Sequence, residues 1–296
     1  MTQQNAIAVS GLRKSYGDQV VLDGHRSRRH RRDGLRALGR NGAGKTTVVK
    51  ILSTLIRADG GDVRVMGHDL ADEVEAIRAA IGVTGQFSAV DSLLTGEENL
   101  RLMADLHHLS RHDGNRRADE LLTTFGLADA ARKPASTYSG GMRRRLDLAM
   151  TLVGSPRLIF LDEPTTGLDP RSRRDLWSII GELVEDGVTI FLTTQYLEEA
   201  DALAGRIAVL DHGRFVAEGT PDELKRSIPG GHVLLRFDSA DALEAAAALR
   251  DSATADPDSL TVKVSSDGSV TALRDLLDNL AATRIEVADR RFTPRI

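Results

Sequence analysis

Hydrophobic and polar positions in the first third of the chain predict short strands and helices in succession. Residues 6–22 (AIAVSGLRKSYGDQVVL) predict two strands around the polar turn Tyr16–Gln19. Residues 62–66 and 81–86 predict two further strands. Between the two pairs, apolar positions in residues 46–60 recur with a helical period. This part of the chain therefore predicts a mixture of strands and helices.

The middle of the chain continues the same order. From Leu93 to Arg132 the pattern is that of amphipathic helices, interrupted at Asp113-Gly114. Further on, short apolar runs predict strands at 158–163, 188–193 and 206–211. Helical periodicity predicts helices at 142–153, 171–185 and 196–204. Strands that alternate with helices in this way imply an α/β fold, with a parallel sheet and helices on both of its faces.

The composition changes after residues 221–231 (PDELKRSIPGG). Beyond this point the pattern predicts strands at 232–237, 259–264 and 284–289, and helices at 240–250 and 269–282. We therefore expect a first domain over residues 1–225 and a small α+β domain over residues 226–296.

Composition and charge exclude several classes of protein. The 296 residues contain no cysteine, which excludes disulfides and cysteine-ligated zinc. The net charge of −4 argues against a surface that tracks nucleic acid. The first residues, MTQQNAIAVS, do not resemble a signal peptide, and no stretch approaches roughly 18 apolar residues. We expect a cytosolic chain that reaches a membrane only through a partner.

Residues 39–46 (GRNGAGKT) match the phosphate-loop pattern GxxxxGK[ST] in full. Glycines in such a loop let backbone amides surround phosphate oxygens, and the dipole of the following helix adds to the attraction. Lys45 is expected to reach the β- and γ-phosphates of the nucleotide, and Thr46 to ligate Mg²⁺. The nucleotide-binding residues expected from this segment are Gly39, Asn41, Gly42, Gly44, Lys45, Thr46 and Thr47.

Two more segments carry polar groups of the kind that nucleotide hydrolysis needs. LIFLDE (158–163) predicts a buried strand that ends in Asp162, a Mg²⁺ ligand, followed by Glu163, which can polarise the attacking water. YSGGMRRRL (138–146) places Ser139, Gly140 and Gly141 at the start of a helix, where they form a second anion site. One nucleotide does not need two such sites, so the second is expected to serve the nucleotide of a neighbouring chain.

In this order, the motifs make residues 7–224 resemble the ATP-binding cassettes of ABC transporters. The resemblance implies a P-loop cassette with a mixed sheet core, an antiparallel β subdomain and a helical subdomain at about residues 88–137. It also implies a head-to-tail homodimer that holds ATP and Mg²⁺ and an integral membrane permease as partner, at the cytoplasmic face of the membrane. It assigns Tyr16 to stacking on adenine, Gln86 to the metal and Asp169 to communication across the dimer.

Two longer segments, TYSGGMRRRLDLA and the stretch from Thr193 to Lys225, resemble ATPases of the daunorubicin-resistance type, which implies drug or antibiotic export. That type also carries a small domain after the cassette, to which we assign regulation or dimerisation. The switch position, usually His in the wider family, is Gln195, which can donate a hydrogen bond but cannot ionise. Gln195 is therefore expected to sense the γ-phosphate. The alternatives are a non-transport ABC ATPase and a weakly hydrolysing regulatory protein.

Residues 25–36 do not fit this pattern, because they hold six arginines and two histidines where the resembled family has apolar strands. If the arginines are encoded by CGN codons, a reading frame shifted by one base permits an apolar strand, a glycine turn and a second apolar strand. A compensated frameshift, an exposed basic loop and a specific nucleic-acid site all remain open, although no specific nucleic-acid partner is expected.

Overall fold

The chain forms two compact units, Met1–Pro221 and Asp222–Ile296, in the computed structural model. The described residues are 6–24, 35–39, 42–85, 88–196, 199, 205–220, 223–224, 231–247, 253–257, 259–266 and 289–293. The helix expected at 269–282 lies entirely outside the described residues. Most of the helix expected at 196–204 and of the strand expected at 284–289 also lies outside them.

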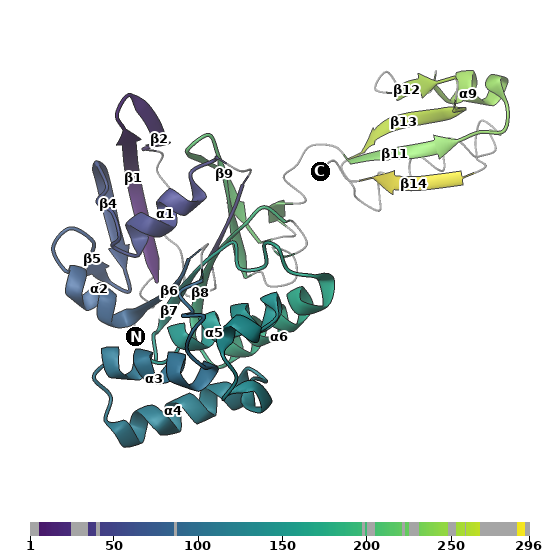
Figure 1. Ribbon diagram of the computed structural model, residues 1–296. Helices are drawn as coiled ribbons and strands as arrows, with labels where there is room; N and C mark the ends of the chain where they lie inside the picture. Colours follow the sequence, from purple (N-terminus) through teal and green to yellow (C-terminus); the bar gives the residue numbers. More distant parts are fainter. Residues whose placement is uncertain are drawn as a thin grey trace. The chain divides into compact units, whose positions relative to one another are not determined.

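A six-stranded sheet in the order β10-β9-β3-β8-β7-β6 forms the centre of the first unit (Figure 1). Its strands are β3 Leu35–Leu38, β6 Ile81–Thr84, β7 Leu158–Asp162, β8 Thr189–Thr194, β9 Arg206–Asp211 and β10 Arg214–Gly219. All neighbours pair in parallel except β10, which is antiparallel to β9. The expected parallel sheet is therefore confirmed, with one antiparallel edge strand added to it.

A second, antiparallel sheet in the first unit has the order β2-β1-β4-β5. Its strands are β1 Ile7–Tyr16, β2 Gln19–Asp23, β4 Gly60–Val65 and β5 His68–Asp69. The turn at Tyr16–Gln19 joins β1 to β2, as the alternating pattern predicts. This sheet is the antiparallel β subdomain of the expected cassette.

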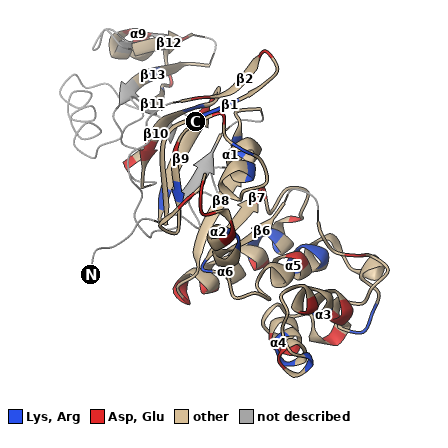
Figure 2. Cartoon of the chain, turned by 90° about the vertical axis from the view of Figure 1, so that its left-hand side faces the viewer, with Lys and Arg blue, Asp and Glu red and all other residues tan. Residues whose placement is uncertain are grey.

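Six helices of the first unit are described. They are α1 Lys45–Leu52, α2 Val74–Ala80, α3 Gly96–Leu106, α4 Arg111–Thr124, α5 Gly140–Thr151 and α6 Pro170–Glu185, with short 3-10 turns at Ala128–Ala130 and Ala135–Thr137. Within the described residues, every helix is too short or too polar to cross a lipid bilayer. Helix α4 carries both acidic and basic residues (Figure 2), and its Arg116 pairs with both Asp113 and Glu120.

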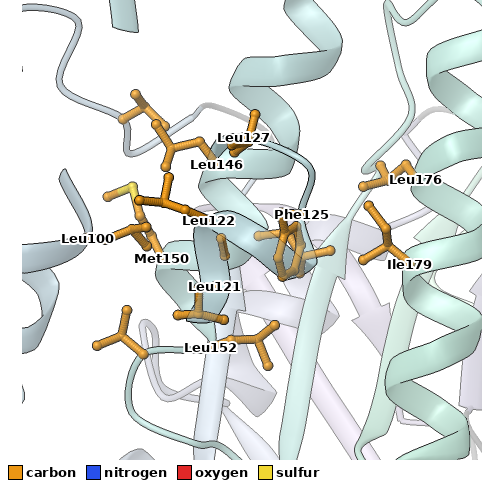
Figure 3. Packing of buried hydrophobic residues seen from close by; sticks show 14 of the residues in the cluster. Leu100, Leu121, Leu122, Phe125, Leu127, Leu146, Met150, Leu152, Leu176 and Ile179 are labelled. Carbon is orange, nitrogen blue, oxygen red and sulfur yellow. The ribbon is translucent and has the colours of Figure 1, made fainter. Parts of the chain in front are cut away.

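Strand β7 is buried on both faces and separates two hydrophobic clusters. Leu158 and Phe160 pack in a cluster with α1 and the antiparallel sheet. Ile159 and Leu161 pack in the other cluster, which joins α3, α4, α5 and α6 (Figure 3). This alternation follows from the pleat of a strand, in which successive side chains point to opposite faces. Packing on both faces fixes the carboxyl end of β7 between these two hydrophobic clusters.

The expected break at Asp113-Gly114 is wrong, because α4 runs through both residues. The helices separate earlier, at residues 107–110, and the Ser110 side chain caps α4 by accepting a hydrogen bond from the Asp113 amide (3.1 Å). Gly114 serves a different purpose. A Cβ there would lie 2.9 Å from the Cβ of Ala104, so the glycine lets α3 and α4 pack closely.

The second unit contains a four-stranded antiparallel sheet in the order β12-β13-β11-β14. Its elements are β11 Gly231–Arg236, α9 Ala240–Ala247, β12 Ala253–Asp256, β13 Thr261–Ser266 and β14 Asp289–Thr293. Leu235, Phe237, Val262 and Val264 form its core with Leu243 and Ala246 of α9. The sequence pattern missed β12, whose residues Ala253–Asp256 do not form an apolar run.

Candidate functional site

The phosphate loop connects β3 to α1 and depends on three glycines. Gly42 and Gly44 have φ of 81° and 102°, a backbone conformation that side chains disfavour. A Cβ at Gly39 would overlap the carbonyl oxygen of Leu210. Helix α1 begins at Lys45, and the amide of Val48 donates to the Gly44 carbonyl (3.0 Å). The first amides of α1 therefore point from the helix N-terminus toward the loop.

Lys45 is buried at this loop, and its polar contacts include a backbone carbonyl and a carboxylate. Its ammonium donates to the Gly39 carbonyl (2.7 Å) and lies 3.2 Å from Oε1 of Glu163. The Lys45 side chain is 4% exposed and that of Glu163 is 13% exposed. The structure thus brings together the predicted phosphate-binding lysine and the predicted general base, which are far apart in the sequence.

Asp162 and Glu163 leave β7 in a fixed conformation. Asp162 accepts a hydrogen bond from the hydroxyl of Thr193 on β8 (2.5 Å). The Glu163 amide donates to both the carbonyl and the hydroxyl of the same Thr193 (3.1 Å each). Glu163 has φ of 48°, a left-handed conformation that costs a non-glycine residue about 1–3 kcal/mol. As a result, the Asp162 carboxylate lies against Thr193, whereas the Glu163 carboxylate lies against Lys45.

A cavity of about 350 Å³ lies at the loop. Its lining consists of Val21, Gly42, Gly44, Lys45, Thr46, Thr47 and Glu163. All but Val21 were expected from the sequence to bind or hydrolyse the nucleotide. The cavity therefore places glycine amides, a cation, hydroxyls and a carboxylate around one space, which is the chemistry that a polyphosphate requires.

Two other predicted site residues that the structure describes, Tyr16 and Gln195, are not part of this lining. Tyr16 ends β1 and is 49% exposed, with the Lys14 ammonium 5.6 Å from the centre of its ring. Gln195 follows β8 and is half-buried. Asn41 and Gln86 lie outside the described residues.

Ser139, Gly140 and Gly141 begin α5 and do not line the cavity. Ser139 is exposed and caps the helix by accepting a hydrogen bond from the Met142 amide (3.2 Å). Gly141 is buried, and a Cβ there would lie 2.5 Å from the hydroxyl oxygen of Ser172. An exposed cap on one chain is the arrangement that an anion site for a neighbouring chain requires.

Asp169 caps α6. Hydrogen bonds from Ser172, led by that of its hydroxyl (2.6 Å), lower the pKa of the Asp169 carboxyl from its usual 3.8. Because this carboxylate stays charged near neutral pH, it favours the N-terminus of the helix through the helix dipole. The resemblance assigns Asp169 to contacts across a dimer, and within one chain the structure gives it this capping role.

Two residues that support the site were not found from the sequence. Thr193 holds both Asp162 and the Glu163 amide, and the Gly213 amide donates to the Ala43 carbonyl in the phosphate loop (3.0 Å). Both lie in the stretch from Thr193 to Lys225, but the sequence does not single out either of them as a site residue. Their roles come from the register of β8 on β7 and from the β9–β10 turn, and an isolated threonine or glycine carries no sequence signal for them.

Comparison with known proteins identifies the family. The family model described as ABC transporter matches residues 17–166. The chain is 53% identical over 244 residues to the daunorubicin resistance ATP-binding protein DrrA3 of Streptomyces coeruleorubidus, covering 82% of this chain and 77% of that protein. The chain belongs to the ABC transporter family. As a member of that family it is an ABC-type ATP-binding subunit and an ATPase.

Other relatives agree with this membership. The daunorubicin/doxorubicin resistance ATP-binding protein DrrA of Streptomyces peucetius is 52% identical, over 79% of this chain and 71% of its own length. A solved ATP binding subunit of an ABC transporter superposes with a TM-score of 0.66 at 30% identity, covering 75% of this chain and 92% of the other. An ABC cassette solved as a dimer in a post-hydrolysis state, with ADP and Pi, gives 0.65 at 25% identity, covering 73% and 98%.

Proposed function

We propose that this chain is the ATP-hydrolysing subunit of an exporter that drives efflux of an amphipathic drug or antibiotic through a separate membrane permease. The drug-resistance names of its relatives support the export of such compounds. The observation that carries the ATPase part is the contact between Lys45 and Glu163 at the phosphate-loop cavity. These relatives do not favour the alternative of a weakly hydrolysing regulatory protein.

One chain would hold most of the nucleotide. The adenine would stack on the exposed ring of Tyr16, and the phosphates would occupy the cavity, against the loop amides and Lys45. Asn41, which lies outside the described residues, belongs to the same loop. Because Lys45 is almost completely buried, its charge attracts phosphate oxygens through little intervening water.

A second copy of the chain would complete the site. Ser139 and Gly140 are exposed at the N-terminus of α5, where a hydroxyl and helix amides can receive the γ-phosphate of the partner's ATP. Gly141 keeps the start of the same helix close to α6. Asp169, at the start of α6, would contact the facing cassette. The solved dimeric cassette with ADP and Pi supports a homodimer of this kind.

Magnesium fits the oxygen donors at this site. Thr46 lines the cavity, and the buried Asp162 ends the strand beside it. Hydroxyl and carboxylate oxygens are ligands that Mg²⁺ prefers, and it commonly takes one or two carboxylates together with substrate phosphates. We assign Thr46, Asp162 and Gln86, the last outside the described residues, as its ligands. When bound, Mg²⁺ neutralises charge that develops on the phosphates.

Hydrolysis follows from the Lys45–Glu163 contact. A triphosphate competes with Glu163 for the ammonium because it carries more negative charge. Glu163 can then accept a proton from a water molecule, whose oxygen attacks the γ-phosphorus while the bond to the β–γ bridging oxygen breaks, giving ADP and phosphate. Gln195 would donate its amide hydrogens to the γ-phosphate without taking up a proton.

We propose that the chain binds the permease and is thereby held at the cytoplasmic face of the membrane. We propose that residues 226–296 form a regulatory or dimerisation domain that follows the cassette of residues 1–225 in the sequence. The substrate contacts would belong to the permease.

The ATPase assignment is tested with the full chain co-expressed with its permease. We expect Glu163→Gln to lower kcat by about 10²–10⁴-fold, since that is the usual contribution of a general base. Glu182→Gln on the exposed side of α6 is the matched control and should leave kcat unchanged. ATPase activity that is insensitive to Glu163→Gln would contradict the assignment.

The export assignment needs a separate measurement. Cells that express the chain and its permease should accumulate less daunorubicin than cells that express the Glu163→Gln variant with the same permease. Equal accumulation in both cultures, or failure of the chain to co-purify with any membrane protein, would refute the transport function.

A further inference from the structure

A buried arginine donates hydrogen bonds to the backbone on both sides of the proposed general base, Glu163. Arg144, on the second turn of α5, donates from Nε to the Pro164 carbonyl (2.8 Å) and from Nη2 to the Asp162 carbonyl (3.4 Å). These two carbonyls lie on either side of Glu163 in the chain. From Nη1, Arg144 also donates to the Gly85 carbonyl (3.0 Å). One guanidinium therefore joins α5 to the exit of β7 and to the end of the β6 segment.

Asp147, one turn later on α5, fixes the arginine. Its Oδ2 accepts a hydrogen bond from Nη1 of Arg144 (3.0 Å), and its Oδ1 accepts one from the Ala89 amide (3.0 Å). The two side chains are 11% and 4% exposed. The pair therefore holds two points of the chain, Gly85 and Ala89, in addition to the residues around Glu163.

Burial is the largest influence on the charges of this pair. It lowers the pKa of the Arg144 guanidinium and raises the pKa of the Asp147 carboxyl, while their mutual attraction offsets part of both changes. A buried ion pair of this kind is weak support for stability, because hydrophobic residues of similar volume often serve as well. Its hydrogen bonds to backbone carbonyls around Glu163 suggest a role in geometry instead.

We propose that Arg144 is a positioning residue for ATP hydrolysis, which holds a backbone carbonyl on each side of Glu163, those of Asp162 and Pro164, and that Asp147 orients it. The inference rests on the proposed role of Glu163 as general base. The left-handed φ of Glu163 (48°) needs such support, because the surroundings must hold a strained residue in place. The planar fork of arginine can reach three carbonyls and a carboxylate at once, which a lysine ammonium cannot do.

The proposal predicts different effects of Arg144 on kcat and on KM. Tyr16, Lys45 and Thr46 are not among the hydrogen-bond partners of Arg144, so ATP affinity should depend little on it. The position of the water-activating carboxylate depends on the neighbouring carbonyls that Arg144 holds, and a misplacement of about 1 Å can cost on the order of 10²-fold in rate. Loss of Arg144 should therefore lower kcat and leave KM nearly unchanged.

The test compares the full chain with Arg144→Gln, Arg144→Lys and Asp147→Asn variants. Arg117→Gln is the matched control, because Arg117 also donates to a carbonyl of the α5 end, that of Leu152 (2.9 Å), away from the site. We expect kcat to fall about 10²-fold for Arg144→Gln and about 10-fold for Asp147→Asn and Arg144→Lys, with KM within about threefold. Arg117→Gln should keep the wild-type kcat.

Hydrogen–deuterium exchange gives a readout that does not depend on turnover. Because the Ala89 amide donates to Asp147, peptides covering residues 84–92 should exchange faster in Arg144→Gln and Asp147→Asn than in the wild type. Arg117→Gln should not change them. Unchanged exchange in all variants would overturn the proposal, and so would a raised KM at constant kcat.

Failure of the inference can be told apart from failure of the proposed function. If Glu163→Gln keeps the wild-type kcat, the proposed function is wrong and the inference falls with it. If Glu163→Gln is inactive while Arg144→Gln keeps the wild-type kcat, only the inference is wrong. If Arg144→Gln does not fold, the Arg144→Lys and Asp147→Asn variants decide by the same kcat and exchange criteria.

Discussion

Gly213, in the turn between β9 and β10, allows a direct test of how the phosphate loop is held. Its amide donates to the Ala43 carbonyl (3.0 Å), and its carbonyl accepts from the Asp23 amide on β2 (3.2 Å). Its φ is 76°. A Cβ at this position would overlap the Val21 carbonyl oxygen and lie 2.9 Å from the Val21 carbonyl carbon. We therefore expect Gly213→Ala to push the turn away from β2 and from the loop.

The size of the effect follows from these contacts. Carbon atoms pack at about 3.5–4.0 Å, and a backbone carbonyl cannot rotate away as a side chain can, so a displacement on the order of 1 Å is required. Val21 lines the cavity and Ala43 lies in the loop, so either response moves the nucleotide site. A misplacement of that size can lower kcat/KM about 10²-fold. In addition, alanine at a left-handed φ lowers the free energy of unfolding by about 1–2 kcal/mol, which lowers Tm by roughly 2–8 °C.

Gly187→Ala separates the effect of loop displacement on kcat/KM from the effect of backbone conformation on Tm. Gly187 has a similar φ of 89°, but a Cβ there meets nothing within 4 Å, and the residue lies in the turn between α6 and β8. This variant should lose Tm through the backbone alone and keep the wild-type kcat/KM. Calorimetry and steady-state ATPase assays on both variants provide the comparison. If Gly213→Ala and Gly187→Ala have the same kcat/KM, the support of the loop by Gly213 is refuted.

Two further predictions concern pH. The folded-state pKa of Asp169 is lowered by Ser172, so the charged cap stabilises the fold above the unfolded pKa of 3.8 and loses this effect as the pH falls through the lower folded value. The Tm difference between the wild type and Asp169→Asn should therefore be constant above about pH 5 and shrink below about pH 4, and a difference that acid does not change would contradict this. Gln195→His should leave the shape of the ATPase pH profile between about pH 6 and 8 nearly unchanged, because Glu163 activates the water, and a strongly altered profile would refute that division of roles.

Elements with a strong local pattern could be predicted from the sequence. Strand β7 is five consecutive buried residues between two prolines, and the sequence pattern predicts it with one extra residue, Glu163. The phosphate loop and the start of α5 were equally clear, because glycine and a capping serine mark them. The break at Asp113-Gly114 was wrong because a glycine was interpreted as a helix stop, whereas it permits close contact between α3 and α4.

The supporting residues of the site could not be predicted, because their roles arise between distant segments. Thr193 reaches Asp162 only because β8 pairs with β7 in one register. Arg144 belongs to a run of three arginines that a sequence pattern presents as a solvated basic face. Its partners Gly85 and Pro164 are 59 and 20 residues away, so only the fold identifies it.

The reading frame of residues 25–38 can be tested independently of the protein. Residues 25–34 lie outside the described part of the chain, while β3 follows directly at Leu35–Leu38. Sequencing the genomic DNA across codons 22–41 shows whether the frame shifted by one base encodes the apolar pattern that the family has here. If it does not, the frameshift explanation is wrong and the basic segment belongs to the protein.

The central position of β3 makes Arg36 the residue at which the two explanations differ most. In the parallel register, Arg36 pairs with Leu192 on β8 and with Ile207 on β9, and both partners are buried. The frameshift explanation places an apolar residue at this position, between two buried neighbours, and it therefore predicts that Arg36→Val raises Tm by about 5 °C or more. Arg64→Val on β4, where the arginine side chain is 63% exposed, is the control and should change Tm by no more than about 2 °C. A Tm that falls in Arg36→Val would show that the arginine stabilises the central sheet, and the frameshift explanation would lose its physical basis.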